Sequence, residues 1–275
     1  MNCDTFLLHL RPGRSNAALL QAAADLAARC GARLAGITAC QPMQIVYSEG
    51  CFIGDLIEQD LVAIGRDIAQ AEAEFRATPG VEAGPLAWRS GNTQLGLANY
   101  LATQARSADL LIVGGRRPSS ADATRDPDIG ALIMQVGRPV LVVPEEAPTL
   151  DLGRILVAWK DTREARRATL DALPLLKLAA HVAIVEIAGR HHAQEAHERV
   201  SDVARWLHTH GIEAEASVRQ SQGEDASLLD AVAQDMAADL VVAGAYGHSR
   251  LREWALGGVT RDLLLRLDRC VLLSH

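Results

Sequence analysis

The residues best suited to chemistry lie near the C-terminus, where glycines recur at a regular spacing. The stretch AGAYG, nine further residues and then GGVT run from Ala243 to Thr260. Glycine at the end of a strand lets a ligand approach the main chain without a Cβ in the way. Amides at the start of a helix, together with the helix dipole, favour phosphate, and Thr260 adds a hydroxyl donor. The pattern indicates a nucleotide cradle, and a turn followed by a helix cap is the open alternative.

Other catalytic signatures are missing from the sequence. It contains no G-x-x-x-x-G-K-[S/T] loop, no G-x-S-x-G elbow and no HExxH helix. An ATP-pyrophosphate-cleaving ligase is expected to carry a loop such as S-G-G-x-D-S after its first strand, and this chain has WKDTREA and HLRPGRS instead. We therefore expect no catalytic residue, and at most slow ATP hydrolysis. No metal site is expected either.

Composition narrows the class of protein. The chain has 275 residues, 49% of them apolar, and a net charge of -7, which gives no attraction to nucleic acid or to an anionic membrane. No apolar run reaches the ~18 residues that span a bilayer, and the N-terminus does not resemble an export signal. The five cysteines form no CxxC pair, which suits a reducing compartment. We expect a cytoplasmic protein that binds neither nucleic acid nor membrane.

The elements that must position the glycines occur twice along the chain. TFLLHLRPGRSNAALLQAAADLAARCGARLAGI predicts a strand, a helix capped by Ser15 and a second strand, and RILVAWKDTREARRATLDALPLLKLAAHVAIVEI predicts the same, with Thr162 as the cap. Later segments match too, including ADLLIVGG with ADLVVAGA. Each half reads as five strands alternating with four helices. This predicts an α/β fold of two consecutive doubly wound parallel sheets.

Domain boundaries follow from the polar linker EEAPTLDLG. We predict a first domain over residues 1–147 and a second over 148–275. The first carries an extra segment of nearly twenty residues around 41–62, before a long helix predicted over 56–76. This insertion is read as a surface excursion, with a lid or contact loop as the alternative.

The motif G-A-Y-G, nine residues and G-G-V-T resembles the ATP-binding signature G-x2-G-x9-G-[S/T] of the universal stress protein family. ILVAWKDTREARRA, ADLLIVGG and RPVLVVP also look like that family's first, fourth and fifth strand regions. The resemblance covers both halves and implies a tandem universal stress protein of Rossmann-like, adenine nucleotide alpha hydrolase-like fold. It implies ATP or a related adenine nucleotide as cofactor in the second domain, with Mg²⁺ accompanying it.

The resemblance also implies a set of cofactor-binding residues. They are Ala158, Trp159 and Lys160 after the first strand of the second domain, Ala243, Gly244, Tyr246 and Gly247 after its fourth strand, and Gly257, Gly258, Val259 and Thr260 at the phosphate turn. Two positions depart from the family. Gly258 stands where the signature has Ser or Thr, and Lys160 stands where many members have Asp. The lysine either loses a ribose contact or offsets phosphate charge.

The first domain departs much further from the motif. Aligned back from RPVLVV, its phosphate-turn positions fall on Asp126 and Pro127, which repel phosphate and remove a donor respectively. Gly114 is kept, while Arg116 and Arg117 are read as solvated loop residues. We expect this domain to be structural.

The combined prediction is a tandem universal stress protein that acts in the stress response as a nucleotide-dependent binding module. The alternative is a nucleotide-independent scaffold whose domains pair and present partner-binding surfaces. The family resemblance implies that the fifth strands, PVLVV and CVLLS, pair with each other within the chain. A homodimer is a further open possibility.

Overall fold

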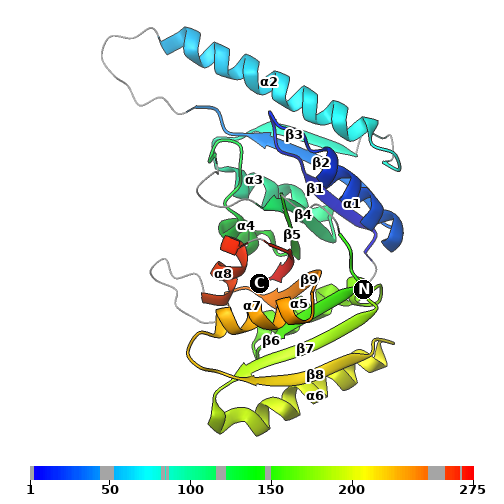
Figure 1. The fold of residues 1–275 in the computed structure, drawn as a ribbon. Helices are drawn as coiled ribbons and strands as arrows, with labels where there is room; N and C mark the ends of the chain where they lie inside the picture. The colour runs from blue at the N-terminus through cyan, green and yellow to red at the C-terminus, as the bar shows by residue number, and fades with distance from the viewer. Residues whose placement is uncertain are drawn as a thin grey trace.

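Two successive runs of alternating strands and helices make up the computed structural model (Figure 1). It describes residues 3–43, 53–81, 84, 87–115, 122–145, 150–246, 258–266 and 268–275. The elements of the first run are β1 Thr5–His9, α1 Ala17–Cys30, β2 Arg33–Cys40, α2 Ile53–Ala77, β3 Trp88–Asn92, α3 Leu97–Gln104, β4 Leu110–Gly115, α4 Ile129–Val136 and β5 Val140–Pro144. Those of the second are β6 Arg154–Trp159, α5 Arg163–Leu176, β7 His181–Ala188, α6 Ala193–Thr209, β8 Ala214–Gln220, α7 Asp225–Asp235, β9 Leu240–Gly244, α8 Gly258–Arg266 and β10 Cys270–Ser274.

The strands form one ten-stranded sheet in the order β3-β2-β1-β4-β5-β10-β9-β6-β7-β8. All neighbours within each half are parallel, as predicted, and the strand order of the second half mirrors that of the first. Only β5 and β10 run antiparallel, with Leu141 opposite Leu272. The fifth strands therefore pair within the chain. Because this seam is antiparallel, the two sets of parallel strands run in opposite directions. Their carboxyl ends therefore lie on opposite sides of the sheet along the strand direction.

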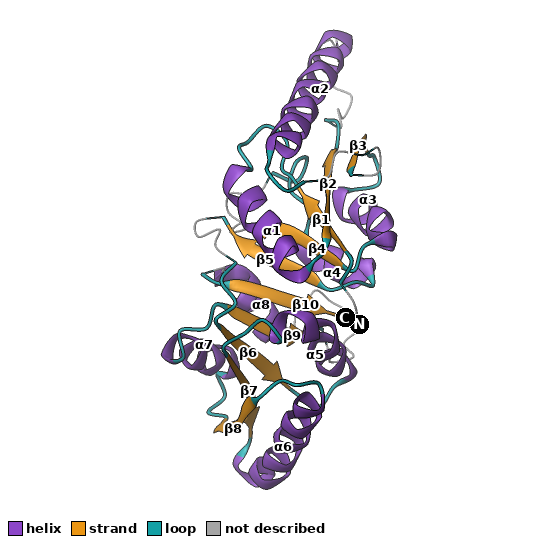
Figure 2. Cartoon of the chain, turned by 90° about the vertical axis from the view of Figure 1, so that its right-hand side faces the viewer, coloured by secondary structure: helices purple, strands orange, loops and turns teal. Residues whose placement is uncertain are grey.

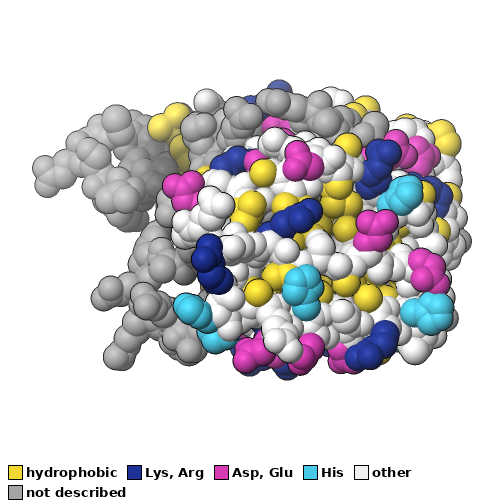
Figure 3. All heavy atoms as spheres, turned by 60° about the horizontal axis from the view of Figure 1, so that its bottom comes forward, with side chains coloured by type: hydrophobic (Ala, Val, Ile, Leu, Met, Phe, Trp, Pro, Cys, Tyr) yellow, Lys and Arg dark blue, Asp and Glu magenta, His cyan; other side chains and the backbone are white. Residues whose placement is uncertain are grey.

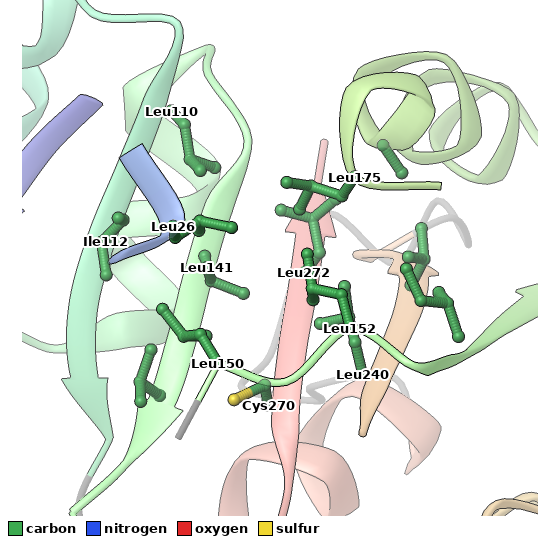
Figure 4. Close-up of a cluster of buried hydrophobic side chains, with 14 of the residues drawn as sticks. Leu26, Leu110, Ile112, Leu141, Leu150, Leu152, Leu175, Leu240, Cys270 and Leu272 are labelled. Carbon is green, nitrogen blue, oxygen red and sulfur yellow. The ribbon is translucent and has the colours of Figure 1, made fainter. Parts of the chain in front are cut away.

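Helices cover both faces of the sheet (Figure 2). Residues of α1, α2, α5 and α6 join the largest buried cluster on one face. Residues of α3, α4, α7 and α8 pack on the other. Figure 4 shows that the large cluster crosses the seam, with Leu141 of β5 and Leu272 of β10 between Leu26 of α1 and Leu175 of α5. The two halves thus share one core, and the boundary at residue 148 stays a prediction.

Local signals fix the ends of the repeated first helix. In α5, Thr162 Oγ1 accepts a hydrogen bond from the amide of Ala165, as predicted. In α1, the prediction of Ser15 as the cap is wrong by one residue, because the helix begins after Asn16. The Asn16 carboxamide instead bonds the amide and carbonyl of Arg11. It therefore fastens the chain that leaves β1.

The second connection of each half differs most between the two runs. Helix α2 has 25 residues and begins three residues before its predicted start, whereas α6 has 17. At the α6 end, side chains of both charge signs and histidines are scattered among hydrophobic atoms (Figure 3). Among the described helices, none is long and apolar enough to cross a membrane.

Candidate functional site

The carboxyl ends of β6 and β9 bring the first predicted site residues together. Ala158 and Ala243 are direct partners in the parallel register. Both side chains pack on the sheet face that α7 and α8 cover. Val259, near the start of α8, packs against the same cluster as Ala158. Two small side chains therefore lie side by side at the sheet edge, with the start of a helix above the same face.

Helix α8 begins at Gly258, one residue before the helical stretch that the sequence predicts after the glycine pair. Its first turn contains Val259, which is half-buried, and Thr260, which is buried. The predicted residues Gly247 and Gly257 lie outside the described residues. The role of the Thr260 hydroxyl as a ligand donor stays a prediction.

Trp159 and Lys160 have different surroundings at the end of β6. Strand alternation turns Trp159 into the main core on the α5 side, away from Ala158. Its indole Nε1 is buried without a hydrogen-bond partner in the described structure. Lys160 follows the last residue of β6 and is exposed. Lys160 is thus placed near the edge, whereas Trp159 serves the core.

Gly244 is explained by helix packing. A Cβ added to this residue would lie 2.4 Å from the backbone nitrogen of Ala165 and 2.6 Å from the carbonyl carbon of Glu164, both in the first turn of α5. Real Cβ atoms do not approach backbone so closely, so only glycine lets α5 lie directly on β9. For this glycine the packing requirement is sufficient without a ligand.

The first turn of α5 also holds a buried carboxylate. Burial by itself would raise the pKa of Glu164, but hydrogen bonds from Arg163 and from a backbone amide outweigh it and hold that pKa below its usual value. Nearby, Asp161 pairs with Arg166 at 2.6 Å. No cluster of three or more metal-ligating side chains occurs among the described residues.

Tyr246 connects the loop after β9 to the first half. Its backbone is left-handed, with φ of 62°, and its ring meets that of His275 edge-on at 6.4 Å. Burial, with a smaller contribution from the negative charge of Asp128, raises the pKa of Tyr246 to about 12. Asp128 caps helix α4 of the first half by accepting from the amide of Ala131. Tyr246 is therefore held near the boundary between the halves.

The corresponding edge of the first half is closed by its own side chains. Phe6 pairs with Leu110 as Ile155 pairs with Leu240, so that His9 corresponds to Ala158 and Arg11 to Lys160. Arg11 Nε lies 2.5 Å from Asp126 Oδ1, and both side chains are only 9% exposed. Arg11 Nη1 also binds Glu145 at 2.8 Å. Asp126, which the sequence alignment of the halves places at the phosphate turn, is thus bound by an internal cation. Arg116 and Arg117 lie outside the described residues.

A pocket of about 70 Å³ remains in the first half, between the start of α1 and the ends of β4 and β5. Gly114, Ser15 and Glu145 line it. Nucleotide-sized sites need roughly 300 Å³ or more. This pocket is smaller than that, and the structural role of the first domain stays a prediction.

His9 gives the closed edge a pH dependence that can be measured. Burial lowers the pKa of His9 from 6.5 to about 4. Between those pH values the unfolded chain binds more protons than the folded one, so stability should fall by about 2–3 kcal/mol as the pH drops from 6.5 to 4. The measurement is urea unfolding at both pH values. His9→Ala should lose this part of the slope while being less stable overall; an unchanged slope contradicts the assignment.

Comparisons with known proteins agree with this architecture. No family model matches the sequence, and neither does any curated protein. A universal stress protein from Archaeoglobus fulgidus DSM 4304 superimposes with a TM-score of 0.75 at 14% identity, covering 99% of this chain and 96% of that chain. A functionally unknown protein from Pseudomonas aeruginosa PAO1 gives 0.62 at 18% identity, covering 99% and 92%. A universal stress protein in complex with cAMP covers 44% of this chain and 96% of its own, at 18% identity and a TM-score of 0.34. The whole-chain matches establish the universal stress protein fold.

Proposed function

We propose that this chain is a tandem universal stress protein whose second half binds ATP or a related adenine nucleotide. The nucleotide lies over the carboxyl ends of β6 and β9, with its phosphates at the start of α8. Binding alters the shape or the partners of the protein, which acts in the cytoplasm as a regulatory module of the stress response and not as an enzyme.

The observation that carries this proposal is the difference between the two equivalent sheet edges. The second half presents the small pair Ala158 and Ala243, where the first half has the buried His9 beside the Arg11–Asp126 ion pair. Of this pair, Ala243 is buried and Ala158 is half-buried, so the small Ala158 leaves more room for a base or ribose than the buried imidazole and paired charges of the first edge. The helix start at Gly258 supplies the amides and dipole that favour phosphate.

The chain's own residues suit a nucleotide in defined ways. Lys160 is exposed and directly follows β6, and we propose that its positive charge offsets phosphate charge. At Gly258 the chain keeps a backbone amide at the start of α8, while the family's hydroxyl is missing. Mg²⁺ would arrive with the phosphates, because Asp161 is engaged with Arg166.

A nucleotide-independent scaffold is the second candidate, and Gly244 favours it. This signature glycine is required by the contact with α5 whether or not a nucleotide binds. Lys160 and Gly258 also depart from the family pattern at ligand positions. In this case the two halves only pair and present their surfaces to partners.

Nucleotide binding is tested by mass spectrometry of the nucleotide extracted from native protein, and by thermal unfolding with millimolar ATP. Saturation near 100 times the dissociation constant should stabilise the protein by about 2.7 kcal/mol, a rise of roughly 5–10 °C in Tm. Gly257→Asp, which copies Asp126 of the first half, should abolish the rise. Arg14→Ala, which changes an exposed residue of the first half, should keep it.

Each variant is compared with and without ATP, so that changes in intrinsic stability cancel. An empty extract together with no shift in Tm at millimolar ATP excludes the nucleotide proposal and supports the scaffold.

A further inference from the structure

Large hydrophobic side chains are exposed along the first half of α2. The exposed fractions are 52% for Leu56, 43% for Ile57, 44% for Leu61 and 55% for Val62. These residues point in several directions around the helix, within two turns. A helix end that is apolar on most sides is ordinarily enclosed by protein, and a contiguous exposed apolar surface marks an interaction site.

The equivalent helix of the second half shows that this exposure is not a general property of the fold. Helix α6 follows the second strand of its half as α2 does, and none of its large hydrophobic residues is exposed. Helix α2 is eight residues longer than α6, or about 12 Å of helix. Figure 1 shows α2 extending beyond the sheet. The four exposed residues lie in the N-terminal part of this longer helix.

One side of α2 is already occupied by its own domain. Asp60 and Asp67 lie 3.6 and 3.8 Å from the guanidinium of Arg125, in the turn before α4. Ile64 is fully buried on the sheet side. These contacts fix the helix on the domain and leave its outer side, which carries Val62, open.

Charges on the open side are arranged symmetrically about Val62. Glu58 precedes Val62 by four residues and Arg66 follows it by four, so all three lie along one side of the helix. Both charged residues are exposed, and neither forms an ion pair or hydrogen bond with any residue the structure describes. An antiparallel copy of the same helix, crossing at Val62, would place each Glu58 opposite Arg66 of the partner subunit.

We propose that α2 is a homodimer interface, in which two copies of this chain pack their α2 helices antiparallel with Val62 at the two-fold axis. The apolar residues Leu61 and Val62 exclude water at the centre, and the two Glu58–Arg66 pairs set the direction. Self-complementary charge favours a second copy over an unrelated protein, because a two-fold interface must match itself. This interface is separate from the nucleotide edge and does not depend on it.

Light scattering coupled to size-exclusion chromatography, over a range of protein concentrations, tests the interface. The wild type should dimerise in a concentration-dependent way, and Val62→Asp should raise the dissociation constant about tenfold or more. Leu95→Asp is the matched control, because Leu95 is 81% exposed in the same half but lies outside α2. A wild type that stays monomeric, or a dimer that Val62→Asp leaves intact, overturns the proposal.

Charge reversal distinguishes the antiparallel arrangement from any other use of the same surface. Glu58→Arg alone and Arg66→Glu alone should each weaken the dimer about threefold or more, and the double variant should recover wild-type affinity. A residue on the two-fold axis also meets itself, so Val62→Cys should give a covalent dimer under mild oxidation, beyond the wild-type background, and Leu95→Cys should not. Failure of both the charge rescue and the Val62→Cys crosslink overturns the proposed geometry.

Discussion

Replacing Gly244 with alanine is expected to lower the free energy of unfolding by about 3 kcal/mol or more. The new Cβ would lie 2.4 Å from the Ala165 nitrogen, and backbone in a helix cannot move aside as a flexible side chain can. Helix α5 must then shift away from β9, where Ala165 and Ala168 are buried. Such overpacking costs about 1–3 kcal/mol in ordinary cores, and more where backbone is the obstacle.

Gly114 provides the matched control for this prediction. It holds the equivalent position at the end of β4, but its added Cβ would meet only Leu19 Cδ2, at 3.5 Å, which is ordinary contact. Gly114→Ala should change the unfolding free energy by less than about 1 kcal/mol. Urea unfolding of both variants makes the comparison. Equal losses at the two glycines contradict the packing explanation of Gly244.

Removing the carboxylate of Asp126 is expected to destabilise the first half by about 3–4 kcal/mol. Arg11 and Asp126 form a nearly enclosed ion pair, and Asp126 also accepts from the amide of Asp122 at 2.8 Å. Among the described residues, Asp126→Ala leaves the buried guanidinium of Arg11 with the more exposed Glu145 as its remaining acidic partner. Breaking one side of a buried ion pair costs about 3–5 kcal/mol, because the remaining charge stays desolvated.

The exposed pair of Asp161 and Arg166 serves as the control for Asp126. Their side chains are 51% and 58% exposed, so Asp161→Ala should cost less than about 1 kcal/mol. Replacing both buried partners, as in Arg11→Met with Asp126→Leu, should recover most of the stability. Denaturant unfolding distinguishes these outcomes. If Asp126→Ala costs no more than Asp161→Ala, the buried pair is not a structural element of this edge.

Most of the architecture could be predicted from the sequence because its signals are local and repeated. Apolar runs such as LLIVG and LVVAG indicate buried parallel strands, and the repeat of the whole pattern fixes the order of elements. Thr162 can be recognised as the cap because a threonine stands directly before the helical pattern, and its hydroxyl accepts from the Ala165 amide. The prediction of Ser15 is wrong by one residue because the next residue, Asn16, is an equally common type at the start of a helix.

The candidate site was predicted less completely, since its chemistry depends on contacts between distant residues. The sequence indicated that Asp126 spoils the phosphate turn of the first half, but not that Arg11, 115 positions away, binds it. Aligning the two halves places a cation, Arg11 or Lys160, after both first strands, and this was the signal that could have found the pair. The packing role of Gly244 required the position of α5, which no local pattern contains.

The antiparallel seam between β5 and β10 has a consequence for how the two halves can differ. Two identical chains that met through such strands would need the same residues at the carboxyl ends of both sets of strands, and their pairing would be lost on dilution. Here the seam joins parts of one chain, so it forms at an effective concentration set by the connection and not by the amount of protein. The first half can therefore hold the enclosed Arg11–Asp126 pair at the carboxyl ends of its strands, while the second half has Ala158 and Ala243 there. The molecule is therefore built as a permanent pair of unequal halves.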